Sequence, residues 1–190
     1  MTDMNGGHVE EAVAEMARVL TPYATADWHI PAGTLDWTCW TTAAHVAHDI
    51  TAYAMQLVTR ETRRYLPLDL LVRPGTPPRE VLDVVTAAGR LLATTVTAAP
   101  PDARAWHWGP ADASGFAALG VNETLIHTYD ISQGLGVRWL PPASLSAAVL
   151  ARLFPDAPDG DPVRTLLWCT GRIDLPGRPR LTSWTLRAAR

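Results

Sequence analysis

The stretch VNETLIHTYDISQGLG, residues 121–136, places three ligand-competent side chains on one face of a predicted helix. Glu123, His127 and Asp130 follow one another at i, i+4 and i+7, and these intervals return to the same side of a helix. Apolar residues fill much of the remaining circumference, so we expect this helix to be packed on several sides. A buried carboxylate and imidazole need partners, and a divalent metal ion can serve as one. The glycines that follow predict the end of the helix.

A third metal ligand is expected from a second predicted helix. A Glu–His pair at this spacing is also common as a weak surface interaction, and a metal site normally needs three ligands. The second helix begins near Trp37 or Thr38 and carries His45 and His48 on one face, next to small alanine side chains. Two histidines three residues apart lie side by side. The pattern alone leaves open which of them completes a site.

Composition limits the classes of protein that this chain fits. A chain of 190 residues, 47% of them apolar, is long enough for one core and a small appended unit. The net charge of −3 and the lack of a dense basic cluster argue against binding to nucleic acid. The two cysteines, Cys39 and Cys169, are too few for a disulfide framework, which favours a reduced cytoplasm.

Targeting and membrane signals are not evident in the sequence. The first residues, MTDMNGG, show no basic region followed by an apolar run. We identify no stretch of membrane-spanning length. The sequence therefore predicts a soluble cytoplasmic protein that does not bind membranes.

Apolar periodicity and breakers predict further helices, and together they favour an all-α fold. The predicted helices cover residues 8–20, 77–98, 144–153 and 163–170, and two short strands are expected around the turn at 176–177. Thr76 and Ser114 are the expected N-caps of the third and fourth long helices. Four long helices with ligand candidates on the second and fourth predict a bundle that holds a metal between facing helices.

Two other segments are interpreted mainly as packing. The aromatic run around His107, from Trp106 to Trp108, is expected to pack over the end of the bundle, with the mouth of a pocket as the alternative. Cys39 lies beside Trp40 near a helix start, where the dipole can activate a thiol. Burial in the core is the simpler interpretation for this cysteine.

Two motifs resemble a known family. The segment WTCWTTAAHVAH, residues 37–48, is similar to the tryptophan-led helix start ending in Ala-His-Leu of DinB-like bundles, specifically the mycothiol-dependent maleylpyruvate isomerase N-terminal domain. The segment NETLIHTYDISQGLG, residues 122–136, is similar to that family's Glu-x-x-x-His-x-x-Asp helix. The resemblance implies a DinB-like four-helix bundle over residues 1–140. Residues 141–190 would form a C-terminal extension packed on it, with short helices and a β-hairpin.

The resemblance also implies roles for individual residues. The family's metal ligands fall on His45, Glu123 and His127. Zinc suits this set best, although nickel, iron or manganese accepts similar ligands. His48 is the candidate for proton transfer, with a hydrogen bond to the substrate or simple packing as the alternatives. Asp130 would orient an imidazole or position a thiol, with a helix-surface or capping role as the alternative.

The implied activity is metal-dependent and uses mycothiol or another low-molecular-weight thiol. It would be a cis–trans isomerisation or an S-transfer on small electrophilic metabolites. Two alternatives are a non-catalytic metal-containing stress or ligand-binding bundle and a metal-dependent hydrolase. A carboxylated substrate would require cations beside the metal, for which Arg90, Arg104 and Arg138 are the candidates. The resemblance further implies a homodimer formed through a bundle face.

Overall fold

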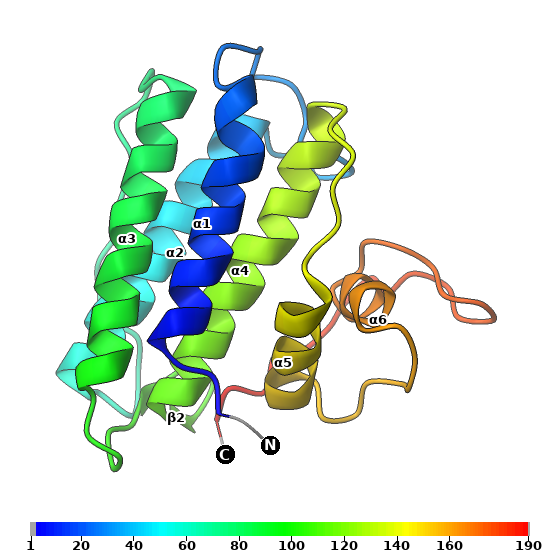
Figure 1. Ribbon diagram of the computed structural model, residues 1–190. Coiled ribbons are helices and arrows are strands. Elements are labelled where there is room, and N and C mark those ends of the chain that lie inside the picture. Colours follow the sequence, from blue (N-terminus) through cyan, green and yellow to red (C-terminus); the bar gives the residue numbers. More distant parts are fainter. Residues whose placement is uncertain (1–2, 190) are drawn as a thin grey trace.

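The computed structural model describes residues 3–189, and it confirms the mostly helical class (Figure 1). Within this range there are six α-helices, one short 3-10 helix and one pair of two-residue strands. In chain order the elements are α1 (Gly6–Leu20), η1 (Thr21–Tyr23), α2 (Cys39–Thr59), α3 (Pro78–Ala98), β1 (Ala105–Trp106), β2 (Pro110–Ala111), α4 (Ala113–Gly134), α5 (Ala143–Leu153) and α6 (Pro162–Cys169).

The four long helices pack around a shared core. Helix α1 contacts both α3 and α4, and α2 contacts the same two helices, so that each long helix touches at least two others (Figure 1). Helix α5 packs on α4, and α6 packs on α5. The chain after α4 therefore adds a smaller helical unit to one side of the four long helices.

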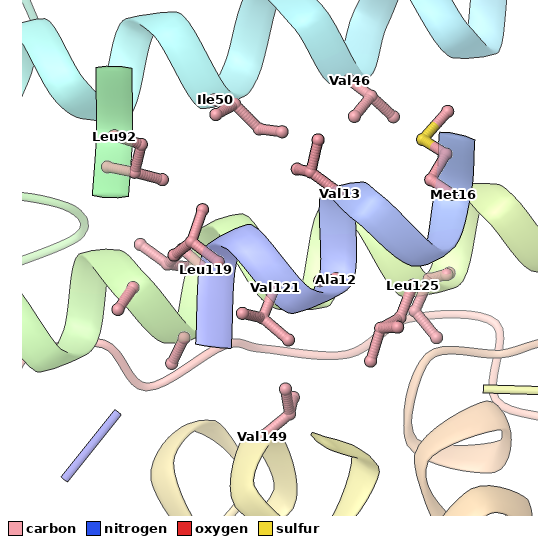
Figure 2. Packing of buried hydrophobic residues seen from close by; sticks show 14 of the residues in the cluster. Ala12, Val13, Met16, Val46, Ile50, Leu92, Leu119, Val121, Leu125 and Val149 are labelled. Atoms are coloured by element: carbon pink, nitrogen blue, oxygen red, sulfur yellow. The ribbon is translucent and has the colours of Figure 1, made fainter. Parts of the chain in front are cut away.

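Helix α4 is enclosed on almost all sides. Sixteen of its 22 residues are buried, which confirms the expectation that this helix is not a surface element. Figure 2 shows Leu119, Val121 and Leu125 of α4 among apolar residues of α1, α2, α3 and α5, namely Ala12, Val13, Met16, Val46, Ile50, Leu92 and Val149. The buried polar side chains of α4 therefore lie in a closely packed environment that fixes their positions.

Two predicted helix caps are wrong. The Thr76 hydroxyl donates to a backbone carbonyl in the preceding turn, and α3 follows Pro77, which has no side-chain cap. Helix α4 starts two residues before the expected position, because the Asp112 carboxylate accepts a hydrogen bond from the N–H three residues on. Ser114 instead accepts a hydrogen bond from the backbone N–H of Met4, which ties the approach to α1 to the start of α4.

The predicted hairpin near the C-terminus is also wrong. An isolated bridge between Leu175 and Arg178 is the only ladder at that turn within residues 3–189. The segment beyond it forms hydrogen bonds with helices: the indole N–H of Trp168 donates to Pro179 O, and the backbone N–H of Arg187 donates to Leu153 O. A strand needs a partner strand, and this segment lies against α5 and α6 instead. The one antiparallel pair that forms, β1 with β2, lies in the connection between α3 and α4.

The expectation that no stretch reaches membrane-spanning length is corrected by helix α3. Of the helices in the described part of the chain, it alone is long and apolar enough to cross a membrane by length and composition. In this structure it packs against α1 and α2, and Val81, Val85 and Leu92 are buried there. A core helix of a globular protein has the same composition, so this feature is weak evidence for a membrane span.

A glycine at the end of α4 allows that helix to approach the segment before α2. A Cβ atom at Gly134 would meet the carbonyl oxygen of Pro31 and lie 2.7 Å from Sγ of Cys39. We expect Gly134→Ala to lower the free energy of unfolding by about 2 kcal/mol, because the backbone there cannot move aside. Urea unfolding measures this change. Gly7→Ala is the control: a Cβ there would meet only the end of the exposed Asn5 side chain, at 3.2 Å, which can move, so this change should cost much less. Equal losses in both variants would contradict the close approach at Gly134.

Candidate metal centre

Side chains from two facing helices meet at one point. His45 comes from α2, and Glu123 and His127 come from α4. One ligand atom from each residue lies within 4.8 Å of the other two. Glu123 Oε2 is 3.3 Å from His127 Nε2 and 3.7 Å from His45 Nε2. The carboxylate therefore lies between the two imidazoles.

These distances suit a divalent ion held by two nitrogens and one oxygen. Ligand atoms bound to zinc at 2.0–2.1 Å in tetrahedral geometry are separated by roughly 3.3 Å. The two carboxylate–imidazole distances are close to that separation, so small side-chain movements would complete the site. Three protein ligands leave a further position for water or substrate, as in catalytic zinc sites.

The charges of Glu123 and His127 depend on each other. Burial alone would raise the pKa of Glu123, but hydrogen bonds from His127 and His45 outweigh burial and hold the pKa well below its usual range. Burial would likewise lower the pKa of His127, yet Asp130 and Glu123 on either side of the ring raise it to about 9. A metal ion that binds here must displace a proton from the imidazole.

Asp130 lies behind His127 and is itself held by an arginine. Its Oδ2 is 3.0 Å from His127 Nδ1, on the opposite side of the ring from Glu123. Nε and Nη2 of Arg172 donate to the two carboxylate oxygens at 3.1 and 2.7 Å. Asp130 is only 2% exposed, which excludes the helix-surface alternative. A carboxylate in this place fixes the orientation and tautomer of a ligating histidine.

His48 does not join His45 in this group. Its Nδ1 lies 3.6 Å from Oδ1 of Asp69, and its Nε2 lies 4.0 Å from Oδ1 of Asp49. Asp49 also lies 3.4 Å from His45 Nε2, and burial raises the pKa of its carboxyl, with the charge of Glu123 adding to the effect. Asp49 was not predicted as a site residue, although its spacing from His45 repeats the i, i+4 pattern of Glu123 and His127. The proposed proton transfer by His48 stays a prediction.

A cavity of about 260 Å³ lies beside His48 and Asp49. His107 lines it, with its ring edge-on to Tyr53 at 5.7 Å and to Tyr65 at 6.0 Å. The aromatic run therefore lines a cavity at His107, and the expected packing fails at Trp108, which is 75% exposed. Among the described residues, nothing forms a hydrogen bond with the buried Nδ1 of His107.

A larger cleft, of about 390 Å³, opens directly over the candidate metal centre. His45, Glu123 and His127 lie in its wall, and the Trp37 ring packs edge-on against His45 at 4.8 Å. The other lining residues are Leu35, Asp36, Asn122, Ile126, Thr170, Arg172, Trp184 and Leu186. The expected cations Arg90, Arg104 and Arg138 are not part of this lining. The cleft instead contains Arg172, which sequence analysis did not identify.

Cys39 is a packing residue, as expected. Its side chain is buried, and burial raises the pKa of the thiol to about 11. The thiol is therefore protonated at neutral pH and is a poor nucleophile. Cys169 is also buried, and burial raises the pKa of its thiol in the same way.

The comparison with known protein families agrees with this geometry. The model of the family described as the mycothiol maleylpyruvate isomerase N-terminal domain matches residues 9–132, which include all three candidate ligands. Searches of curated proteins and of solved structures found no significant match. The segment that carries Arg172 and Trp184 lies outside the matched region.

The ion pair between Arg172 and Asp130 predicts a large stability loss when the arginine is removed. Both side chains are buried, at 8% and 3% exposure. Arg172→Leu would leave Asp130 without its guanidinium, so we expect the free energy of unfolding to fall by about 3 kcal/mol. Arg187→Leu removes an exposed ion pair with Asp156 from the same segment, and it should cost less than about 1 kcal/mol. Urea unfolding of both variants measures the two losses in free energy of unfolding. Equal losses would show that the buried ion pair contributes no more than the exposed one.

His107 predicts a pH dependence of stability. Burial lowers its pKa to about 4 from an unfolded value near 6.5, so the unfolded chain binds a proton that the folded chain rejects. Stability therefore falls as pH drops through 6.5 towards 4. We expect the wild type to lose about 2 kcal/mol more than His107→Phe between pH 8 and pH 5. Urea unfolding at both pH values gives the difference, and parallel losses would contradict the buried neutral imidazole.

Proposed function

Since the chain belongs to the mycothiol maleylpyruvate isomerase N-terminal domain family, we propose that it is a metal-dependent enzyme that uses a low-molecular-weight thiol. Its reaction would be isomerisation of, or S-transfer to, a small electrophile. The observation that carries the proposal is the convergence of His45, Glu123 and His127 in the wall of a cleft. We further propose a DinB-like arrangement of the four long helices and a cytoplasmic location, where small thiols stay reduced.

In this proposal His45, Glu123 and His127 hold one divalent ion, with zinc as the first choice. A bound divalent ion would lower the pKa of a coordinated thiol, so that a thiolate is present at neutral pH. Asp130 keeps the His127 ring oriented with Nε2 towards the ligand cluster, and Arg172 keeps Asp130 ionised and in place. Two indoles, Trp37 and Trp184, lie in the wall of the same cleft and would contact a bound substrate.

In the proposed reaction, covalent bonds form and break only between the thiol and the electrophile. The thiolate sulfur adds to one carbon of an activated double bond, and the π electrons move onto the conjugated carbonyl oxygen. Rotation about the new single bond, return of the electrons and cleavage of the C–S bond give the isomer and release the thiolate. In S-transfer the adduct is instead protonated at carbon and the C–S bond remains. Asp49 connects the site to His48, the proposed proton carrier, at 3.4 Å from His45 and 4.0 Å from His48.

Metal content tests this proposal directly. Wild-type protein incubated with zinc or nickel should carry about one ion per chain by elemental analysis, because three ligands converge. His45→Ala, Glu123→Ala and His127→Ala should each lose it. His48→Ala and His29→Ala, which change an adjacent and an exposed histidine, are the controls and should keep it.

Two results would contradict the proposal. One is a wild-type protein that binds no divalent ion, and the other is full retention of the ion in the three ligand variants. A cobalt(II)-loaded protein then tests the thiol: its visible spectrum should change when a small thiol is added. A loaded protein that hydrolyses substrates without any response to thiols would favour the hydrolase instead.

A further inference from the structure

We propose that the cleft over the candidate metal centre selects substrates with an uncharged, flat apolar body and discriminates against dicarboxylates, and that residues 170–186 determine this selectivity. The inference rests on the proposed function and names the substrate class of the same site. It follows from three features of the cleft, namely the side chains in its wall, the state of its single arginine and the origin of its outer wall.

Most of the exposed surface of the cleft wall is apolar. Trp37 and Trp184 are each 43% exposed, although tryptophan is usually well buried. They lie with Leu35, Ile126 and Leu186 around a space of about 390 Å³, which is large enough for a small ring compound. A planar apolar group placed there would cover indole surface that now faces solvent, and this burial favours binding.

The charged groups of the cleft do not suit an anionic substrate body. Asp36 and Glu123 are acidic, and Arg172 is the only arginine in the lining within the described residues. The two histidines of the lining, His45 and His127, are assigned to the metal. The guanidinium of Arg172 is already committed. Nε and Nη2 donate to Asp130, Nη1 donates to Thr170 O, and the Trp184 ring lies 5.4 Å from Cζ. Three of its five N–H groups are used in these contacts and the side chain is only 8% exposed, so little of the guanidinium is accessible to a second carboxylate.

The outer wall comes from a fixed part of the C-terminal segment. Thr170, Arg172, Trp184 and Leu186 all follow residue 132, where the family match ends. Gly171 has a φ of 72°, and a Cβ there would lie 2.6 Å from the Trp184 ring and 2.7 Å from Leu181 O. The indole is therefore seated against a backbone that only glycine provides. This part of the wall is held in a fixed position, and the region matched by the family does not contain it.

Two thiols that carry contrasting organic groups test the selectivity. Benzyl mercaptan and mercaptosuccinate both bind a metal through sulfur, but one carries a phenyl ring and the other two carboxylates. We expect the cobalt(II)-loaded protein to bind benzyl mercaptan at least about tenfold more tightly, as read from its visible spectrum. Mercaptosuccinate has additional metal-binding oxygens, so a preference for the phenyl compound must come from the cleft.

Variants of one wall residue locate the source of the preference. Trp184→Ala should reduce the ratio of the two affinities several-fold, and Trp184→Arg should shift it towards mercaptosuccinate by adding a free cation. Trp108→Ala, which removes an exposed tryptophan outside the cleft lining, is the matched control and should leave the ratio unchanged. Elemental analysis of each variant confirms that the metal is still bound.

The outcomes separate this inference from the proposed function. Equal or tighter binding of mercaptosuccinate by the wild type, or an unchanged ratio in both Trp184 variants, would overturn the selectivity while the metal centre stands. Failure to load any metal would contradict the proposed function alone. In that case, ligand-observed NMR with benzyl alcohol and succinate on metal-free protein still decides the selectivity. Binding of benzyl alcohol that is weakened by Trp184→Ala supports it, and preferential binding of succinate overturns it.

Discussion

The alternation of charge along Glu123, His127, Asp130 and Arg172 is the constraint on which the rest of the structure depends. All four side chains lie in or at the edge of an apolar interior, where an unpaired charge costs several kcal/mol. Each therefore needs the next: carboxylate, imidazole, carboxylate and guanidinium follow one another within 3.3 Å. The first part of this chain of contacts comes from α4, and the last comes from the segment after α6. The candidate metal centre and the C-terminal segment are thus held by one continuous set of ion pairs.

The packing of α4 makes this arrangement precise. A helix with apolar residues around most of its circumference must be covered on all sides, and α1, α2, α3 and α5 cover it. Close packing leaves its few polar side chains little freedom, so Glu123 and His127 face His45 without a loop to position them. By contrast, the cleft is walled largely by connecting segments, from Leu35 to Trp37 and from Thr170 to Leu186. Rigid helices hold the ligand atoms, while connecting segments shape what can reach them.

Local periodicity explains which parts of the site could be predicted from sequence. Glu123, His127 and Asp130 share a face because they lie within one helix, and that requires no knowledge of the rest of the fold. The choice between His45 and His48 depends on how α2 is rotated about its axis relative to α4, and only the family resemblance favoured one of them. Arg172 lies 42 residues beyond Asp130, across two helices and several turns, so no pattern relates them. The C-terminal hairpin failed for a similar reason, since a strand-like sequence forms a strand only where a partner strand is within reach.

The division between the matched region and the C-terminal segment has a consequence for how activity and selectivity are linked. All three candidate ligands lie within residues 9–132, so metal binding depends first on the helices α2 and α4. Part of the cleft wall that faces an incoming substrate lies beyond that range, at Thr170, Arg172, Trp184 and Leu186. If metal binding and substrate selectivity were independent, a change in the C-terminal segment would alter selectivity alone. Arg172 prevents this independence, because the same guanidinium packs against Trp184 in the wall and holds Asp130 behind His127. Changes in the wall that disturb Arg172 therefore also change the orientation and basicity of a ligating imidazole.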